Sequence, residues 1–396
     1  MMDLEAMKTK VQAEIDKYQD EFWQTAEYIH ANPELRFEEF KAAKALCDLL
    51  ENHGFEVQRG YCELPTAFRA VKEGKAGGPT IGLLCEYDAL VEIGHACGHN
   101  LIGTISAAAG IAVSSILEEV CGKIVVLGTP AEEGGGGKVL ILNRGGMDDL
   151  DCAMIIHPTD KTMVDDVSLA NSEITFRFTG KSAHAAAYPQ EGVNALEAVI
   201  ATFNNINGIR LNLPKDASVH GIITKGGIAT NIITENAECM FSVRAMKRSV
   251  LNVVLEKVKN CARAAALSTG CSLEMVMSEG HNYDEIDNNV LMKELLHKNF
   301  DLLGEPVAPR LADKGMGSTD MGNVTLAMPG FQAYIGLGEG AVTHTPEFAQ
   351  FSTGETGYHA LITAAKALAM TTVDLLAQPE LVEQAKAEFQ ASKEDK

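Results

Sequence analysis

The chain has 396 residues, of which 46% are hydrophobic and 22% are charged, and its formal net charge is −21. This length exceeds the size at which a single hydrophobic core usually stops growing, so two domains are expected. The acidic balance argues against nucleic acid and membrane surfaces as partners, because both require clustered Lys and Arg side chains.

The N-terminal segment MMDLEAMKTKVQAEIDKYQD has no apolar signal core, and no apolar run approaches ~18 residues on inspection. The nine cysteines are odd in number and scattered, and several lie inside apolar runs, as is typical of reduced core residues. We therefore expect a soluble protein of the cytoplasm.

Helices and strands are predicted to alternate along the first 160 residues. Helical apolar spacing covers residues 4–30, 38–53 and 100–120. Strand-like runs cover residues 55–60, 67–74, 80–90, 123–130 and 151–158, with a short helix between the last two. This alternation indicates an α/β fold with a mostly parallel sheet and helices on its faces.

A different order of elements begins near residue 170. The runs SEITFRFTG, SVHGIITKGG, AECMFSVRAM and CSLEMVMSEG have the pattern of strands, and a helical segment follows the first and the third of them. Their order, β-α-β-β-α-β, is the ferredoxin-like arrangement. We therefore predict an inserted α+β domain at residues 169–283 and a main domain made of residues 1–168 and 284–396.

The stretch GTPAEEGGGGK, residues 128–138, invites comparison with a phosphate-binding loop. A P-loop requires Gly-x-x-x-x-Gly-Lys-Ser/Thr, but Glu132 occupies the first glycine position and Val139 replaces the hydroxyl residue. Two adjacent carboxylates would also repel a triphosphate. The glutamates are therefore the candidates for chemistry, and the glycines would let the backbone pass close to a metal ion.

Potential metal ligands stand at or just past the ends of predicted strands. They are Asp88 after GLLCEY, Cys97 and His99 in HACGHN, Glu132 and Glu133 after KIVVLGTP, and His157 at the end of DCAMIIHP. The carboxyl ends of the strands of an open α/β sheet form its ligand-binding crevice. These residues, distant in sequence, are therefore expected to converge.

The chemistry of this set suits a transition metal such as zinc, which accepts thiolate, imidazole and carboxylate ligands. A thiolate or a carboxylate could bridge two ions roughly 3.5–4 Å apart, which together would activate water and polarise a carbonyl. Of two adjacent glutamates, one can be a ligand and the other a general base. Taken singly, Cys97 and His157 could also be core residues, Glu132 and Glu133 a solvated loop, and Asp88 a turn cap.

Further motifs extend the pattern: GKSAHAAAYP with His184, GGIATNIITENAECMFSVRA, MGSTDMGN with Asp320, and THTPEF with His344. With HACGHN, GTPAEEGGGGK and IIHP in this order, nearly the whole chain resembles the aminoacylase and dipeptidase family of two-metal hydrolases, the M20 peptidases. It is most similar to the amidohydrolase branch. The resemblance implies a zinc-exopeptidase-like catalytic domain and an inserted ferredoxin-like domain through which the family typically forms dimers.

Within that branch, CEYDAL, STDMGN and Asn100 resemble the aminobenzoyl-glutamate hydrolases and the β-alanyl-lysine dipeptidases. Hippurate-type relatives usually have aspartate at the position of Asn100. Other branches of the family have a histidine where this chain has Glu86. The chain therefore departs from the hippurate-type pattern and from the ligand set of the other branches.

The resemblance also implies roles for the matching residues. The five matching metal ligands, which would hold two divalent ions with Cys97 as the bridge, are Cys97, His99, Glu133, His157 and His344. Glu132 matches the general base, and Asp88 matches the aspartate that orients a ligand. His184 matches a histidine that reaches the other subunit's site and stabilises the oxyanion. Asn231 and Arg244 match groups that hold the substrate's tetrahedral centre and carboxylate.

We therefore predict metal-dependent hydrolysis of the amide bond of a small N-acyl amino acid or dipeptide, resembling aminobenzoyl-glutamate or a β-alanyl dipeptide, by a homodimer. The ligand set accepts zinc, manganese, cobalt or nickel. One alternative is a cysteine amidohydrolase with Cys97 as the nucleophile, which leaves the glutamates and His157 without a function. Another is a non-catalytic relative that binds a metal ion or an amino acid.

Overall fold

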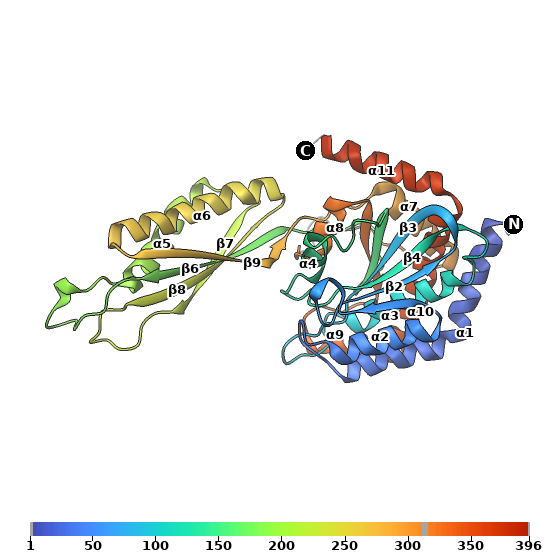
Figure 1. Cartoon of the computed structure of the whole chain (residues 1–396), viewed down its shortest axis with the longest axis horizontal. Helices are drawn as coiled ribbons and strands as arrows, with labels where there is room; N and C mark the ends of the chain where they lie inside the picture. Colours follow the sequence, from blue (N-terminus) through green and yellow to red (C-terminus); the bar gives the residue numbers. More distant parts are fainter. Residues whose placement is uncertain (1–2, 311–315, 395–396) are drawn as a thin grey trace. The chain divides into compact units, whose positions relative to one another are not determined.

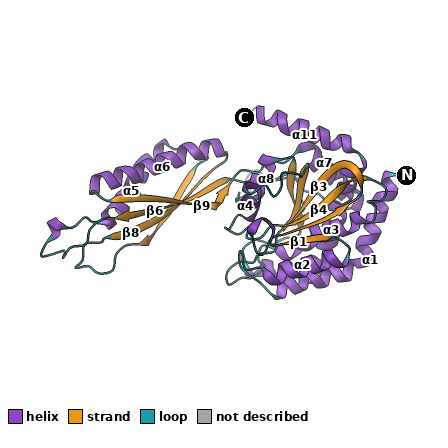
Figure 2. Ribbon diagram, in the orientation of Figure 1, coloured by secondary structure: helices purple, strands orange, loops and turns teal. Residues whose placement is uncertain are grey.

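The computed structural model describes residues 3–310 and 316–394, and the chain divides into two compact units. The first unit contains residues 1–167, 286–316 and 320–396. The second contains residues 168–285 together with the short segment 317–319. Figure 1 labels the helices and strands of each unit, and Figure 2 distinguishes them by type.

A six-stranded mixed sheet forms the centre of the first unit, in the order β1-β2-β4-β3-β5-β10. Its strands are β1 (Glu56–Arg59), β2 (Phe68–Glu73), β3 (Lys75–Cys85), β4 (Cys121–Gly128), β5 (Cys152–Thr159) and β10 (Gly330–Gly336). Strands β3, β4, β5 and β10 pair in parallel, whereas β1 and β2 pair antiparallel at one edge. The prediction of an α/β fold with a mostly parallel sheet is confirmed.

Helices cover both faces of this sheet, because alternate strand residues belong to two separate cores. Leu83 and Val126 pack with the apolar faces of the helices on one side, and Leu84 and Val125 pack with those on the other. The first face carries α1 (Leu4–Ala31), α2 (Phe40–Asn52), α3 (His99–Ser114), α7 (Val290–Leu303) and α10 (Gly354–Ala377). The second carries α4 (Gly137–Asn143) and α8 (Met321–Ala327). Helices α9 (Pro346–Phe351) and α11 (Pro379–Glu394) also belong to this unit.

Helix α10 corrects the expectation that no apolar run approaches 18 residues. Its most apolar window of 18 residues has a mean hydropathy of 1.5, which is long and apolar enough to cross a membrane by composition alone. However, 89% of that window is buried inside the protein, as expected for a core helix. The window is not a continuous apolar run, because Lys366 and Asp374 interrupt it. The carboxylate of Asp374 is itself buried in an ion pair with Lys8, at 2.7 Å.

The second unit is a four-stranded antiparallel sheet in the order β7-β8-β6-β9, with two helices packed on one face. Its elements are β6 (Ala170–Thr179), α5 (Ala195–Ile209), β7 (Ser218–Lys225), β8 (Asn236–Ala245), α6 (Arg248–Thr269) and β9 (Ser272–Tyr283). Alternate residues of β6, such as Ile174, Phe176 and Phe178, are buried beneath the helices. The predicted ferredoxin-like arrangement is confirmed.

Candidate metal centre

The predicted ligands lie at the carboxyl ends of three neighbouring strands. Asp88 follows β3, Glu132 and Glu133 follow β4, and His157 lies in the last half of β5. These strands are adjacent in the order β4-β3-β5 and run in parallel, so their carboxyl ends meet at one edge of the sheet. Such an edge is where open α/β sheets bind ligands.

Donor atoms from six side chains gather there in three overlapping groups, within each of which they all lie within 4.8 Å of one another. The groups are Cys97 with His99 and His157, Cys97 with Glu133 and His344, and His99 with Glu132 and Glu133. All five predicted ligands are therefore brought together, along with the predicted base. A thiolate, imidazoles and carboxylates are the donors that zinc and similar divalent ions accept.

Asp88 holds two of these residues in place. Its Oδ1 lies 2.9 Å from Nδ1 of His99, and its Oδ2 accepts a hydrogen bond from the backbone amide of Glu133 at 2.9 Å. The other ring nitrogen of His99, Nε2, is buried and has no hydrogen-bond partner among the described residues. A histidine whose second nitrogen is held by a carboxylate is the usual arrangement of a metal ligand. The residues present therefore fit a bound divalent ion.

The turn that carries Cys97 and His99 depends on the glycine between them. Gly98 has φ of 76°, and a Cβ added there would lie 2.4 Å from Cγ of Pro158, so only glycine fits. This close approach seats Sγ of Cys97 3.4 Å from Nε2 of His157. Burial lowers the pKa of His157 to about 4, which keeps its imidazole in the neutral form that binds metals.

The protonation of Cys97 bears on the alternative of a cysteine nucleophile. Burial, together with the nearby Glu133, raises the pKa of the Cys97 thiol well above its ordinary value. A cysteine nucleophile requires the opposite environment, one that favours the thiolate at neutral pH. The surroundings of Cys97 therefore favour a metal ligand over a nucleophile.

The two adjacent glutamates differ in their electrostatic surroundings. Burial and the charge of Glu133 raise the pKa of Glu132 well above its ordinary value, so Glu132 holds a proton readily. Burial acts in the same direction on Glu133, but His344 and His99 outweigh it and the pKa of Glu133 is lowered. Neighbouring carboxyl groups whose pKa values are driven apart are typical of an acid–base group beside a permanently charged one.

His344 approaches this centre from the loop before α9. Its Nε2 lies 3.2 Å from Oε1 of Glu133, and its backbone amide donates to the carbonyl of Ala96 at 2.8 Å. The backbone of His344 has φ of 64°, an uncommon conformation for a residue with a Cβ. Its side chain is 55% exposed, so His344 forms the solvent side of the cluster.

Three charged residues that sequence reasoning did not connect lie behind the cluster. The Nζ atom of Lys138 donates to Oε1 of Glu86 at 2.5 Å and to Oδ1 of Asp320 at 2.6 Å. All three side chains are fully buried. The sequence feature that could have indicated this buried ion pair is Lys138, a cation placed immediately before the apolar run VLIL.

The glycines of GTPAEEGGGGK shape the turn that follows the two glutamates. Gly134 and Gly136 have φ of 86° and 66°, and a Cβ on Gly137 would lie 1.9 Å from the carbonyl oxygen of Pro130. The atoms nearest to a Cβ at Gly134 or Gly137 belong to Arg36 and Pro130. These glycines let the chain reverse direction after the two glutamates.

The remaining predicted site residues lie in the second unit. The amide of Ala185, next to His184, donates to the carbonyl of Asn231 at 3.0 Å, so His184 and Asn231 are neighbours, and both are exposed. Arg244 lies near the far end of β8, eight residues beyond Asn236, or roughly 27 Å at a rise of ~3.4 Å per residue. The second unit by itself does not gather the three residues at one place.

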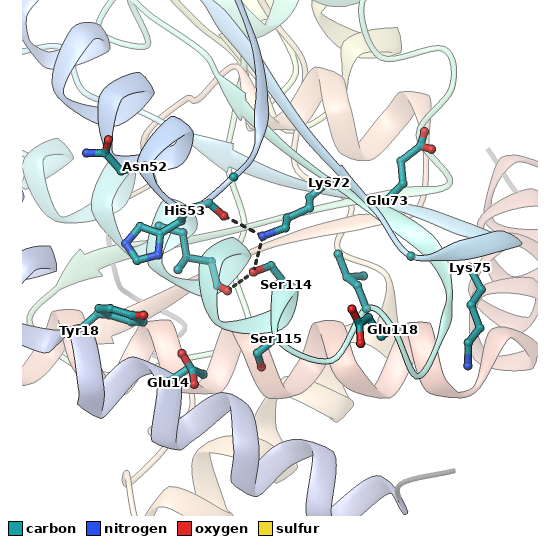
Figure 3. A pocket seen from close by; sticks show the side chains of 14 residues that line it. Glu14, Tyr18, Asn52, His53, Lys72, Glu73, Lys75, Ser114, Ser115 and Glu118 are labelled. Carbon is teal, nitrogen blue, oxygen red and sulfur yellow. Dashed lines mark hydrogen bonds between the residues drawn. The ribbon is translucent and has the colours of Figure 1, made fainter.

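A separate cavity of about 1000 Å³ opens elsewhere on the first unit (Figure 3). Its walls include Tyr18, His53 and Glu118, and Lys72 within it donates to the carbonyl of His53 at 2.7 Å and to the hydroxyl of Ser114 at 3.2 Å. It lies beside the start of β3, away from the carboxyl end of that strand. Among the described residues, none of the predicted ligands lines it.

Comparison with known proteins agrees with this arrangement. The model of the peptidase dimerisation domain matches residues 168–269. The chain is 36% identical to the Xaa-Arg dipeptidase of Mus musculus, over 98% of the chain and 93% of that protein. It is 30% identical to one of the subunits of p-aminobenzoyl-glutamate hydrolase from Escherichia coli (strain K12), over 96% of the chain and 93% of that protein.

Two solved structures share the fold. The aminobenzoyl-glutamate utilization protein of Klebsiella pneumoniae has a TM-score of 0.73 at 18% identity, and covers 92% of this chain and 98% of its own. A dinuclear metal-binding peptidase of the M20 family from Bacillus subtilis has a TM-score of 0.68 at 20% identity, and covers 91% of this chain and 99% of its own.

Proposed function

The chain belongs to the M20 family of metal-dependent peptidases and amidohydrolases, and from this premise we propose that it is a dipeptidase that releases a basic amino acid from the carboxyl end of its substrate. Metal-dependent hydrolysis of an amide bond is the reaction of its family. The finer assignment is supported by the Xaa-Arg dipeptidase relative, which aligns over nearly the full length of both chains. The net charge of −21 is also compatible with a cationic substrate.

One observation carries the proposal: the donor atoms of Cys97, His99, Glu133, His157 and His344 gather in overlapping groups of three near the carboxyl ends of parallel strands. We infer that they hold two divalent ions, with zinc, manganese, cobalt and nickel all compatible with the donors. When bound, such ions supply an activated water molecule and polarise the carbonyl of the substrate.

The residues of the chain would then carry out the proton transfers. Glu132 is buried, and its carboxylate would accept a proton from the attacking water. Its pKa is raised by burial and by Glu133, which favours return of that proton to the leaving amine. Asp88 orients His99 and the amide of Glu133 through both of its oxygens. We assign oxyanion stabilisation to His184 and substrate binding to Asn231 and Arg244.

A second candidate substrate is p-aminobenzoyl-glutamate, because a hydrolase of that compound is 30% identical over 96% of the chain. The two substrates differ in the charge of the released side chain, which is positive in arginine and negative in glutamate. The test is a panel of Xaa-Arg and Xaa-Lys dipeptides, p-aminobenzoyl-glutamate, acetyl amino acids and hippurate, assayed with metal-reconstituted enzyme. The highest kcat/KM on a basic dipeptide supports the proposal, and the highest value on p-aminobenzoyl-glutamate replaces it with the second candidate.

We also propose that the protein is a homodimer assembled through the second unit. The match to a peptidase dimerisation domain supports this assignment, as does the edge strand β7, on which Ile222 and Ile223 are 58% and 47% exposed. An exposed apolar edge strand is a ready template for pairing with another chain. The separation of Arg244 from His184 and Asn231 would be explained if one catalytic site draws residues from two subunits.

The oligomeric state is measured by light scattering of the eluting protein. We expect twice the chain mass of 42.4 kDa for the native protein, and a monomer for Ile222→Asp. Leu302→Asp, at a site 62% exposed on the first unit, is the matched control and should leave the mass unchanged. A native mass of 42.4 kDa would contradict the proposed dimer.

A further inference from the structure

A buried lysine pairs with two carboxylates next to the metal-binding cluster. Lys138 bonds Oε1 of Glu86 and Oδ1 of Asp320 through its ammonium group, and its backbone amide donates to Oδ2 of Asp320 at 2.9 Å. Asp320 therefore has both oxygens occupied. Burying a charged side chain is costly unless it is paired with an opposite charge. The ammonium group of Lys138 therefore stabilises the buried carboxylates of Glu86 and Asp320.

Glu86 differs from Asp320 in that only one of its oxygens is occupied. Its Oε2 is buried, has no hydrogen-bond partner among the described residues, and lies 3.5 Å from Nε2 of His99. That nitrogen is the atom of His99 left for a metal ion, because Asp88 holds the other. These two buried atoms thus face each other across an ion-pair distance, and among the described residues neither has a hydrogen-bond partner.

The distance between these atoms matches that between two ligands of one ion. With bonds of about 2.1 Å to a tetrahedral ion, neighbouring ligand atoms lie roughly 3.4 Å apart. A carboxylate oxygen and an imidazole nitrogen are also both accepted by zinc and manganese. The geometry is therefore that of two ligands sharing a cation.

A second buried Lys–carboxylate pair in the same unit gives the contrast expected of a purely structural ion pair. Lys8 bonds Oδ1 of Asp374 at 2.7 Å, and Asn299 donates to Oδ2 of Asp374 at 2.9 Å. Both oxygens of that carboxylate are occupied within the protein. Glu86 leaves one oxygen turned toward a group that binds metal ions.

We propose that Glu86 is a further metal ligand, which shares one divalent cation with His99, and that Lys138 is the positioning residue that fixes Glu86 by holding its other oxygen. This inference rests on the proposed metal centre. It assigns a function to Glu86, at the position where the chain departs from other branches, and to Lys138, which the hydrolytic reaction does not otherwise use.

The test compares metal binding by the purified full chain and by Glu86→Gln, with zinc and manganese titrated into metal-free protein and the bound metal counted by mass spectrometry. We expect the affinity for one ion to fall by at least about 10- to 100-fold, which is the loss typical of a group that only orients a metal ligand. Glu86→Asp is the second variant. It keeps a negative charge beside Lys138, but its side chain is one methylene shorter, so the carboxylate oxygen no longer reaches the proposed ion. Asp374→Asn, in the other buried pair, is the matched control and should bind both ions as the native chain does.

A spectroscopic measurement separates direct ligation from a structural effect. In cobalt-loaded protein, loss of a ligand alters the visible bands of the ion, so Glu86→Gln should change them while Asp374→Asn does not. Native affinities and native cobalt bands in a folded Glu86→Gln or Glu86→Asp protein would overturn the inference and leave the proposed function intact. Absence of metal binding by the native chain would instead overturn the proposed function.

Discussion

Oε1 of Glu39 accepts a hydrogen bond from the backbone amide of Ala131, the residue immediately before Glu132, at 3.0 Å. The same oxygen accepts from the amide of Phe37 at 2.8 Å, and Oε2 accepts from the hydroxyl of Thr66 at 2.8 Å. Ala131 and Phe37 have φ of 61° and 63°, which is uncommon for residues with a Cβ. Glu39 therefore stabilises two strained turns, one of which presents the proposed base.

Replacing Glu39 by alanine should destabilise the protein by about 2–5 kcal/mol, because three donors lose their acceptor. The measurement is the free energy of unfolding in urea. Glu38→Ala is the matched control, since Glu38 is the exposed neighbour of Glu39 and should change this value little. Equal stabilities of the two variants would show that Glu39 does not hold the turns.

The same carboxyl group should make stability depend on pH. Burial, with a contribution from Asp88, raises the pKa of Glu39 from 4.5 to about 7. The folded state therefore keeps the proton to a higher pH than the unfolded chain does, and this stabilisation is complete below about pH 4.5 and lost as the pH rises through about 7. The free energy of unfolding should fall more steeply between pH 5 and pH 8 in the native protein than in Glu39→Gln, with urea titrations at each pH as the measurement. Parallel profiles would contradict the assignment.

Glu132→Gln tests the general base. We expect folding and metal content to be unchanged while kcat falls by about 10²- to 10⁴-fold, since the variant has the same shape but cannot take up the proton. Metal content by mass spectrometry and steady-state kinetics are measured on the same preparation. Glu133→Gln is the informative companion, because loss of a ligand should lower the metal content as well. Near-native turnover in Glu132→Gln would assign the base to another residue.

His184→Ala tests the assignment of oxyanion stabilisation. Loss of one such donor costs about 10²- to 10³-fold in kcat, and the metal content should be unaffected, because His184 lies in the second unit. The neighbouring Lys181 is also exposed, and Lys181→Ala serves as the control for a general disturbance of that loop. Native kcat in His184→Ala would remove His184 from the reaction.

The convergence of the proposed ligands could be predicted from sequence because the place of each depends on local pattern. Cys97, Glu133 and His157 stand at or beyond the ends of recognisable apolar strands. Because the carboxyl ends of parallel strands lie together at one edge of the sheet, these residues are brought close to one another. The predicted ferredoxin-like unit followed in the same way from alternating strands and helical spacing. These features follow from the periodicity of apolar residues and from the order of helices and strands along the chain.

The supporting residues could not be predicted in this way, because their roles depend on contacts between distant segments. Glu39 precedes a helix, and its local sequence is typical of an exposed charged residue. Its side chain is instead buried and accepts a hydrogen bond from the amide of Ala131, 92 residues away. Lys138 and Asp320 are separated by 182 residues, and no local pattern pairs them. Helix α10 was underestimated for a similar reason, since the charge of Asp374 is neutralised by Lys8 at the other end of the chain.

The most direct test of the whole account is hydrolysis of an Xaa-Arg dipeptide by the enzyme before and after removal of metal with EDTA, with bound metal counted on each sample. The account predicts that activity disappears with the metal and returns when zinc, manganese or cobalt is restored, and that Cys97→Ala prevents the return because it lacks the proposed bridging ligand. Full hydrolysis by protein shown to be free of metal would contradict it.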